Sequence, residues 1–242
     1  MEYTEFRDFF LQIFRKNGID HLVNEEMIRK FHDLTRIMVE TNKVMNITAL
    51  TTEDKIIPLH YADCVKISEM IPAGAKIIDV GCGGGFPLLP LAIVRPDLDL
   101  TGLDSTEKKI RYVQNTAKEL GLHVNGISAR AEDLAKDPAH REQYDVAISR
   151  AVARLNLLDE LCIPFVKLGG EFIALKGAAG IDEMQEANNG IQKLGGQIKE
   201  SPEYMLHTTI EEEKRFVIRV SKIQSTPKEF PRAFGAIKKR PL

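Results

Sequence analysis

A glycine-rich segment that follows a short apolar run is the part of the sequence best suited to bind a ligand. Residues 77–80 are apolar apart from Asp79, and Gly81, Gly83 and Gly85 then follow in a Gly-x-Gly-x-Gly pattern. Apolar residues resume directly afterwards, so the segment predicts a strand, a tight turn and a helix. A turn without side chains lets a ligand reach backbone N–H groups.

The spacing of the glycines narrows the choice of ligand. A dinucleotide site carries Gly-x-Gly-x-x-Gly, whose third glycine would fall at Phe86, whereas the third glycine here is Gly85. The Gly-Lys-Ser/Thr ending of a P-loop is absent. An acid followed by Gly-x-Gly-x-Gly resembles the S-adenosylmethionine loop of Rossmann-like methyltransferases. A glycine-rich turn that binds no ligand is the alternative.

A second acidic residue supports a nucleoside ligand. Residues 98–103 alternate like a strand, and Asp104 follows them, 25 residues after Asp79. An acid at about this distance commonly binds ribose hydroxyls, because an ionised carboxylate accepts hydrogen bonds from two neighbouring O–H groups. Asp104 or Ser105 could instead cap the helix predicted over 107–120, and the two roles are compatible.

The composition is that of a globular protein. The chain has 242 residues, of which 43% are hydrophobic and 28% charged, and its net charge is −2. This charge disfavours a globally basic nucleic-acid binder but permits local basic patches. Three widely spaced cysteines match neither a disulfide framework nor a zinc site, so we expect no metal. Without a long apolar stretch or a signal peptide, we expect no membrane contact and a cytoplasmic protein.

Strands and helices alternate from residue 75 onward, which predicts an α/β fold with a parallel sheet and helices on both faces. We expect strands near 75–80, 98–103, 123–128, 144–149 and 170–176, and helices near 86–95, 105–120, 154–163 and 181–195. Residues 197–206 and 214–221 predict an antiparallel hairpin at the sheet edge. Ligands of such sheets bind beyond the carboxyl ends of the strands.

Three regions are expected along the chain. Amphipathic segments at 4–17 and about 25–40 predict an N-terminal helical subdomain over 1–70, followed by a main domain over 71–221. The tail, 222–242, holds six Lys or Arg against one acid, and its prolines preclude a continuous helix. A mobile basic arm with two interleaved phenylalanines suits RNA, and an ordinary solvated terminus is the alternative.

Several segments carry a family resemblance. Residues 83–93 read Gly-Gly-Gly-Phe-Pro-Leu-Leu-Pro-Leu-Ala-Ile, and 42–49 read Asn-Lys-Val-Met-Asn-Ile-Thr-Ala. Shorter segments are His60 to Cys64, Arg130 to Glu132, Ser149 to Ala153, Ala174 to Gly177, and Phe230 to Arg232 with the final Pro241-Leu242. Together they resemble the RsmG family, also called GidB, of small-subunit rRNA guanine-N7 methyltransferases. Cys64, Leu88 and Ala236-Ile237 depart from the usual residues of that family, and no side chain assigned to the cofactor changes.

The resemblance implies a Rossmann-like methyltransferase that transfers a methyl group from S-adenosylmethionine to N7 of a guanine in the 530 loop of 16S rRNA. Its partner would be 16S rRNA or the small ribosomal subunit. Because N7 carries an in-plane lone pair and no proton, we expect no catalytic general base. The alternative is a non-enzymatic ribosome-assembly or RNA-binding factor that retains the S-adenosylmethionine fold.

Candidate site residues follow the carboxyl ends of the predicted strands. For the cofactor they are Gly81, Gly83, Gly85, Phe86, Asp104, Ala131, Glu132 and Arg150. Spacing does not distinguish Glu132 from Asp133, and the resemblance favours Glu132. Arg150 could also hold an rRNA phosphate, and His60 could be a core residue or stack on the target base. Contacts to RNA phosphates are expected from Lys176, Arg232, Lys238, Lys239 and Arg240.

Overall fold

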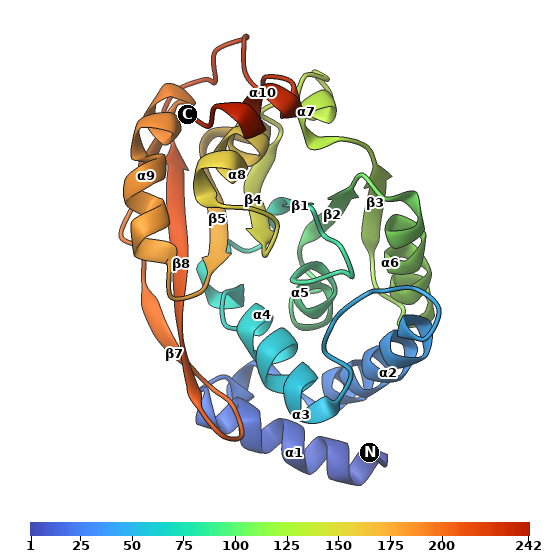
Figure 1. Ribbon diagram of the computed structural model, residues 1–242. Coiled ribbons are helices and arrows are strands. Elements are labelled where there is room, and N and C mark those ends of the chain that lie inside the picture. Colours follow the sequence, from blue (N-terminus) through green and yellow to red (C-terminus); the bar gives the residue numbers. More distant parts are fainter.

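The computed structural model describes residues 1–242, which form one mixed sheet with helices on both faces (Figure 1). The strands are β1 (Lys76–Val80), β2 (Asp99–Asp104), β3 (Val124–Ser128), β4 (Tyr144–Arg150), β5 (Val166–Lys176), β6 (Gly196–Ile198), β7 (Glu203–His207) and β8 (Glu212–Lys222). They lie in the order β3-β2-β1-β4-β5-β8-β6, and β7 pairs with β8. The first five strands are parallel and β8 runs antiparallel to β5. The predicted α/β class is confirmed.

The helices follow the amphipathic segments of the sequence. They are α1 (Tyr3–Lys16), α2 (Glu25–Asn42), α3 (Glu53–Ile56), α4 (Asp63–Val65), α5 (Leu88–Val94), α6 (Glu107–Glu119), α7 (Ala131–Leu134), α8 (Leu155–Cys162), α9 (Gly180–Lys193) and α10 (Phe234–Lys239). A helical turn at Ile57–Ala62 joins α3 to α4. Asn24 begins α2, because its Oδ1 accepts the N–H of Met27 over 3.0 Å. No helix is both long and apolar enough to cross a membrane.

Two apolar clusters hold the helices against the sheet. Strand alternation sends Ile77 to one face and Ile78 to the other. The first face packs against α1, α2, α5 and α6, and the second against α8 and α9. The N-terminal helices therefore share a continuous core with the sheet, and a boundary at residue 70 stays a prediction.

The predicted antiparallel hairpin at the sheet edge is present, but its first strand is divided in two. Residues 197–206 form two strands, β6 and β7, because Pro202 lacks an N–H and interrupts the pairing between them. β8 pairs with both, and it also pairs with β5, so it lies inside the sheet rather than at its edge. β6 and β7 thus form the outer edge of the sheet beside β8.

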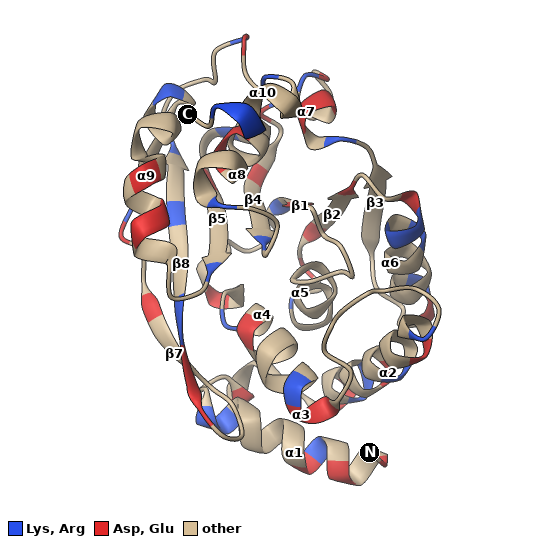
Figure 2. Cartoon of the chain, viewed as in Figure 1, with Lys and Arg blue, Asp and Glu red and all other residues tan.

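The C-terminal tail is neither a free arm nor a solvated terminus. After β8 the chain passes beside α8 and ends in α10, where Ile237 is fully buried. Figure 2 shows Lys and Arg gathered on α10, which lies next to α7 and α8. The tail is thus part of the folded domain, and this placement brings Phe234 to the site described next.

Candidate functional site

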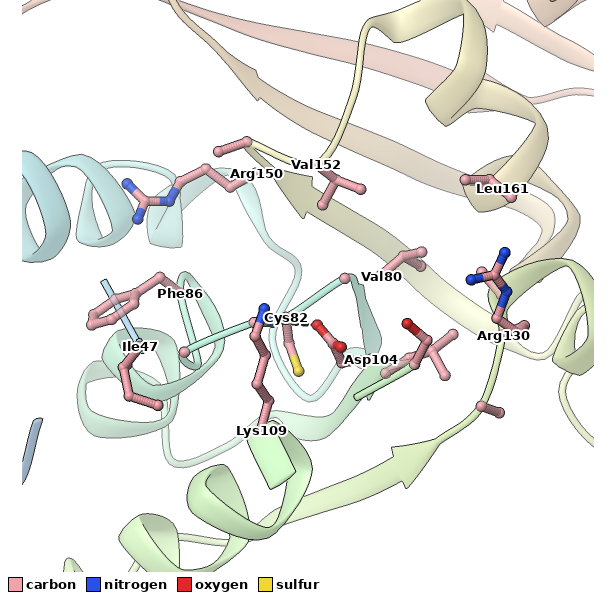
Figure 3. Close-up of a pocket in the computed structure, with 18 of the residues that line it drawn as sticks. Ile47, Val80, Cys82, Phe86, Asp104, Lys109, Arg130, Arg150, Val152 and Leu161 are labelled. Carbon is pink, nitrogen blue, oxygen red and sulfur yellow. Dashed lines mark hydrogen bonds between the residues drawn. The ribbon is translucent and has the colours of Figure 1, made fainter. Parts of the chain in front are cut away.

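A cavity of about 480 Å³ lies beyond the carboxyl ends of β1, β2 and β4. Figure 3 shows Ile47, Phe86 and Arg150 at one end, Arg130 at the other end and Asp104 between them. The strand order reverses between β1 and β4, since β2 and β3 lie on one side of β1 and β5 on the other. In open α/β sheets this point is where ligands bind.

The glycine turn forms a floor of bare backbone. The N–H groups of Gly81 and Cys82 donate to the carbonyl of Leu103 over 2.7 and 3.0 Å, which ties the turn to the end of β2. Gly81 has φ +76°, and a Cβ there would lie 2.5 Å from a methyl carbon of Val152. Side chains are therefore excluded at the position where the cavity meets β1.

Gly83 and Gly85 serve different purposes in this turn. Gly83 lines the cavity at φ +53°, a left-handed conformation that favours glycine. Gly85, at φ +87°, does not line the cavity. A Cβ at Gly85 would lie 2.6 Å from Leu89, so this glycine lets α5 pack closely against the turn.

Asp104 is held in the middle of the cavity by two backbone N–H groups. Its Oδ2 accepts the N–H of Gly83 over 3.1 Å, and its Oδ1 accepts the N–H of Thr106 over 2.8 Å. A carboxylate has about four acceptor positions, so two remain for a ligand. The turn-stabilising and ligand-binding roles considered for Asp104 are compatible in this geometry.

The far end of the cavity combines a carboxylate, a cation and an aromatic ring. Glu132 is 7% exposed, lines the cavity and accepts a hydrogen bond from Nε of Arg130 over 3.0 Å, whereas Asp133 is exposed and lies outside it. The Arg130 guanidinium lies 5.0 Å from the ring centroid of Phe234, which comes from α10. Ala131 lines the same end, so the cation–π pair and α7 form one wall.

Arg150 is engaged within the protein. Its Nη1 donates to the carbonyl of Leu59 over 3.0 Å and to Oδ2 of Asp63 over 3.2 Å, while Nη2 donates to Nδ1 of His60 over 2.7 Å. His60 stacks on Phe86 with ring centroids 4.2 Å apart. Burial, and then the Arg150 charge, lower the pKa of His60 to about 3, so the imidazole is neutral near pH 7.

Two of the cations expected to bind RNA are paired internally. Lys176 is 9% exposed, donates to the carbonyl of Ala153 over 2.6 Å and pairs with Glu183 over 2.8 Å. Arg232 forms an ion pair of 2.6 Å with Glu160, a fully buried carboxylate. The structure places both beside the domain core rather than on a free basic surface.

The remaining expected cations are accessible. The side chains of Lys238, Lys239 and Arg240 are exposed and have no acidic partner within 4.0 Å. They belong to or directly follow α10, whose Phe234 lines the cavity. The tail therefore carries three unpaired positive charges close in sequence to Phe234, a residue of the cavity wall.

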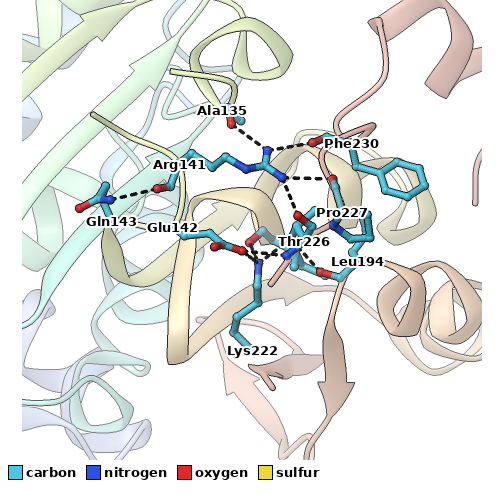
Figure 4. A network of polar contacts seen from close by, with 10 residues as sticks. Ala135, Arg141, Glu142, Gln143, Leu194, Lys222, Thr226, Pro227 and Phe230 are labelled. Atoms are coloured by element: carbon cyan, nitrogen blue, oxygen red, sulfur yellow. Dashed lines mark hydrogen bonds and ion pairs between the residues drawn. The ribbon is translucent and has the colours of Figure 1, made fainter. Parts of the chain in front are cut away.

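Hydrogen bonds from side chains to the backbone of the tail fix it in this position (Figure 4). The guanidinium of Arg141 donates to four carbonyls, those of Ala135, Thr226, Pro227 and Phe230, over 2.8 to 3.2 Å. A second anchor lies beneath, where the buried Lys222 ammonium pairs with Glu142 over 3.1 Å and donates to the carbonyl of Ile163. The position of Phe234 in the cavity wall depends on these contacts.

Several residues of the cavity were not assigned to the cofactor site from the sequence, among them Ile47, Thr48, Lys109 and Phe234. The loop before α3 folds around Asn42, whose Oδ1 accepts the N–H groups of Ile47 and Thr48 over 2.7 and 3.0 Å. Lys109 lies near the start of α6, and its position shortly after Asp104 could have indicated from the sequence that it lies near the cavity. Phe234 is far in the sequence from the other cavity residues, so the sequence did not indicate that it lies in the cavity wall.

The three cysteines are free and buried. Burial raises the pKa of the Cys64 thiol to about 12 and those of Cys82 and Cys162 further above the ordinary value. All three are therefore protonated near pH 7, and a thiol is a much weaker nucleophile than a thiolate. No group of three His, Cys, Asp or Glu side chains is arranged to hold a metal ion.

Comparison with known proteins gives close relatives over nearly the whole chain. The family model GidB, rRNA small subunit methyltransferase G, matches residues 27–211. A ribosomal RNA small subunit methyltransferase G of Brevibacillus brevis is 38% identical over 240 residues, which cover 98% of this chain and 99% of that protein. The protein of the same name from Clostridium perfringens strain 13 is 41% identical over 222 residues, covering 90% of this chain and 92% of that one.

Solved structures share the fold at low identity. The YcgJ protein of Bacillus subtilis aligns with a TM-score of 0.53 at 14% identity, over 69% of this chain and 100% of that one. A SAM-dependent O-methyltransferase of Thermotoga maritima aligns with a TM-score of 0.50 at 16% identity, over 78% of this chain and 72% of that one. At these identities the likeness shows the Rossmann-like fold alone.

Proposed function

This chain belongs to the rRNA small subunit methyltransferase G family, and we propose that it transfers a methyl group from S-adenosylmethionine to N7 of a guanine in the 530 loop of 16S rRNA. The observation that carries the proposal is the Asp104 carboxylate, held by two backbone N–H groups with acceptor positions left over. Such a carboxylate in the middle of the cavity suits the two hydroxyls of a ribose.

The rest of the cavity fits the other parts of S-adenosylmethionine. The bare backbone of Gly81 and Gly83 leaves space for the methionine part, while Glu132 and the wall of Arg130 and Phe234 suit the adenine. When bound, this cofactor supplies an activated methyl group. The end lined by Phe86 then remains for the acceptor base.

The ionisable groups at the acceptor end support a reaction without a general base. His60 is neutral, and both its ring nitrogens are engaged, with Arg150 and with Thr48. Asp79 is fully buried and does not line the cavity, and the Cys82 thiol is held protonated by burial. Because guanine N7 has a lone pair and no proton, the protein needs only to exclude water and to orient the base.

The exposed cations of α10 support RNA as the substrate. Lys238, Lys239 and Arg240 are exposed and unpaired on or directly after α10, whose Phe234 lines the cavity, so they can contact phosphates of an RNA substrate. The net charge of −2 makes such a local patch necessary for RNA binding. The partner would be 16S rRNA, free or in the small subunit, and the protein would act in the cytoplasm.

Two measurements test the proposal. Calorimetry with S-adenosylmethionine should show that Asp104→Ala weakens binding by about tenfold or more, since a hydrogen bond to a charged group contributes about 1.5–3 kcal/mol. The exposed Asp99→Ala on the same strand is the matched control and should bind like the parent. Incubation of undermethylated small subunits with radiolabelled cofactor should then place the label on guanine N7 in the 530 loop. Cofactor binding without transfer to any rRNA would instead indicate a non-enzymatic factor.

A further inference from the structure

A chain of hydrogen bonds that begins at Arg150 fixes the proton of the His60 ring. Nη2 of Arg150 donates to Nδ1 of His60 over 2.7 Å, and a guanidinium has no acceptor atom. Nδ1 therefore carries no proton. Since the ring is neutral near pH 7, its single proton lies on Nε2.

The next member of the chain is the hydroxyl of Thr48. Nε2–H of His60 donates to Oγ1 of Thr48 over 2.8 Å, and the N–H of Leu50 donates to the same oxygen over 3.0 Å. These two bonds occupy both lone pairs of the hydroxyl. Oγ1 can then act only as a donor, and no acceptor in the chain receives its proton. Thr48 lines the cavity beside Ile47 and Phe86, so this proton is available to a bound base.

We infer that the Thr48 hydroxyl selects guanine by donating a hydrogen bond to O6 of the target base. The inference rests on the proposed methylation of N7. In guanine the atom beside the N7 edge is O6, an acceptor, whereas adenine carries the N6 amino group, a donor, at the same place. A hydroxyl that rotates freely would accommodate either base. The N–H groups of His60 and Leu50 remove that freedom, so adenine would place two donors against each other and leave both unsatisfied.

Asn42 holds the hydroxyl in position without lining the cavity itself. Its Oδ1 accepts the N–H groups of Ile47 and Thr48, and its Nδ2 donates to the carbonyl of Thr48 over 3.0 Å. One side chain therefore fixes the backbone from the N–H of Ile47 to the carbonyl of Thr48. Asn42 and His60 are positioning residues, and Thr48 is the residue that would touch the substrate.

The test compares two bases that differ at position 6. Small subunits are reconstituted with guanine or with 2-aminopurine at the target position, because 2-aminopurine keeps N7 and lacks O6. The parent should prefer guanine in kcat/KM by about tenfold or more. Thr48→Val should reduce this preference to about onefold mainly by losing activity on guanine, and Thr48→Ser, which keeps the hydroxyl, should restore it. A Thr48→Val protein with the parent's ratio overturns the inference. A parent that leaves guanine N7 unmodified overturns the proposed function, and the inference with it.

A second readout needs no turnover. Nitrogen NMR of His60 in the whole protein should show a neutral ring with its proton on Nε2 between about pH 5.5 and 8. A proton on Nδ1, or a charged imidazolium in this range, overturns the inference because Thr48 would then have no fixed role as donor. This measurement stays decisive if Thr48→Val does not fold.

Discussion

Arg232 was expected from the sequence to bind an RNA phosphate, and the structure predicts that its main effect is on stability. Its backbone N–H, Nε and Nη2 donate to the carboxylate of Glu160 over 2.7, 2.9 and 2.6 Å. Glu160 is fully buried, while the Arg232 side chain is 25% exposed. Loss of one partner of a buried pair costs about 3–5 kcal/mol. Because water can reach Arg232 in part, we expect Arg232→Ala to lower the free energy of unfolding by about 3 kcal/mol, the lower end of that range.

Urea unfolding measures this loss, and a double-mutant cycle with Glu160→Gln isolates the pair. Lys239→Ala removes an exposed charge from the same tail and should change stability by less than about 0.5 kcal/mol. In RNA titrations across a salt series, Lys239→Ala should lower the slope by about one unit, whereas folded Arg232→Ala should keep the parent's slope. An Arg232→Ala protein of unchanged stability whose salt slope falls would refute the reasoning and restore the sequence-based role.

Three further results are expected. The pKa of His60 is lowered from 6.5 to about 3, so the folded state favours the neutral ring and loses stability as pH falls below 6.5. Over about 1.5 pH units below 6.5, the free energy of unfolding of the parent should fall by about 2 kcal/mol relative to that of His60→Gln, measured by urea unfolding. Equal pH dependence of stability in the two proteins would contradict this. Phe234→Ala should weaken S-adenosylmethionine binding by about tenfold in calorimetry, with unchanged affinity indicating that the ring does not stack on adenine. No covalent RNA adduct should form at Cys64, Cys82 or Cys162, and mass spectrometry that finds one would contradict N7 chemistry.

The regular elements were predictable because their signals are local. Apolar alternation and helical spacing located β1 to β4 and α1, α2, α5, α6, α8 and α9 to within a few residues. The division of residues 197–206 into β6 and β7 was missed because both halves have strand-like composition. Only the pairing with β8 shows that Pro202 separates them.

The candidate site likewise has one part that could be predicted from the sequence and one part that could not. Gly81, Gly83 and Asp104 follow strand ends, and strand ends in one parallel sheet meet at one edge, so their proximity could be derived from the sequence. The place of Phe234 could not, since it depends on Arg141, which captures the tail from 85 to 89 residues away in sequence. Because Phe234 lies in the cavity wall, removing residues 225–242 should weaken cofactor binding.

Charge alone does not tell which cations are available to RNA. Arg232 and Lys239 look equivalent in the basic tail, yet one is committed to Glu160, 72 residues earlier, and the other is free. The sequence did contain a sign of this, because α8 reads Leu-Asn-Leu-Leu-Asp-Glu-Leu-Cys and places two acids in an apolar helix. A buried carboxylate requires a partner, so Glu160 of α8 needs a cation from elsewhere in the chain. Only the three-dimensional path of the tail identifies that cation as Arg232, and this leaves the basic side chains of α10 free for a substrate.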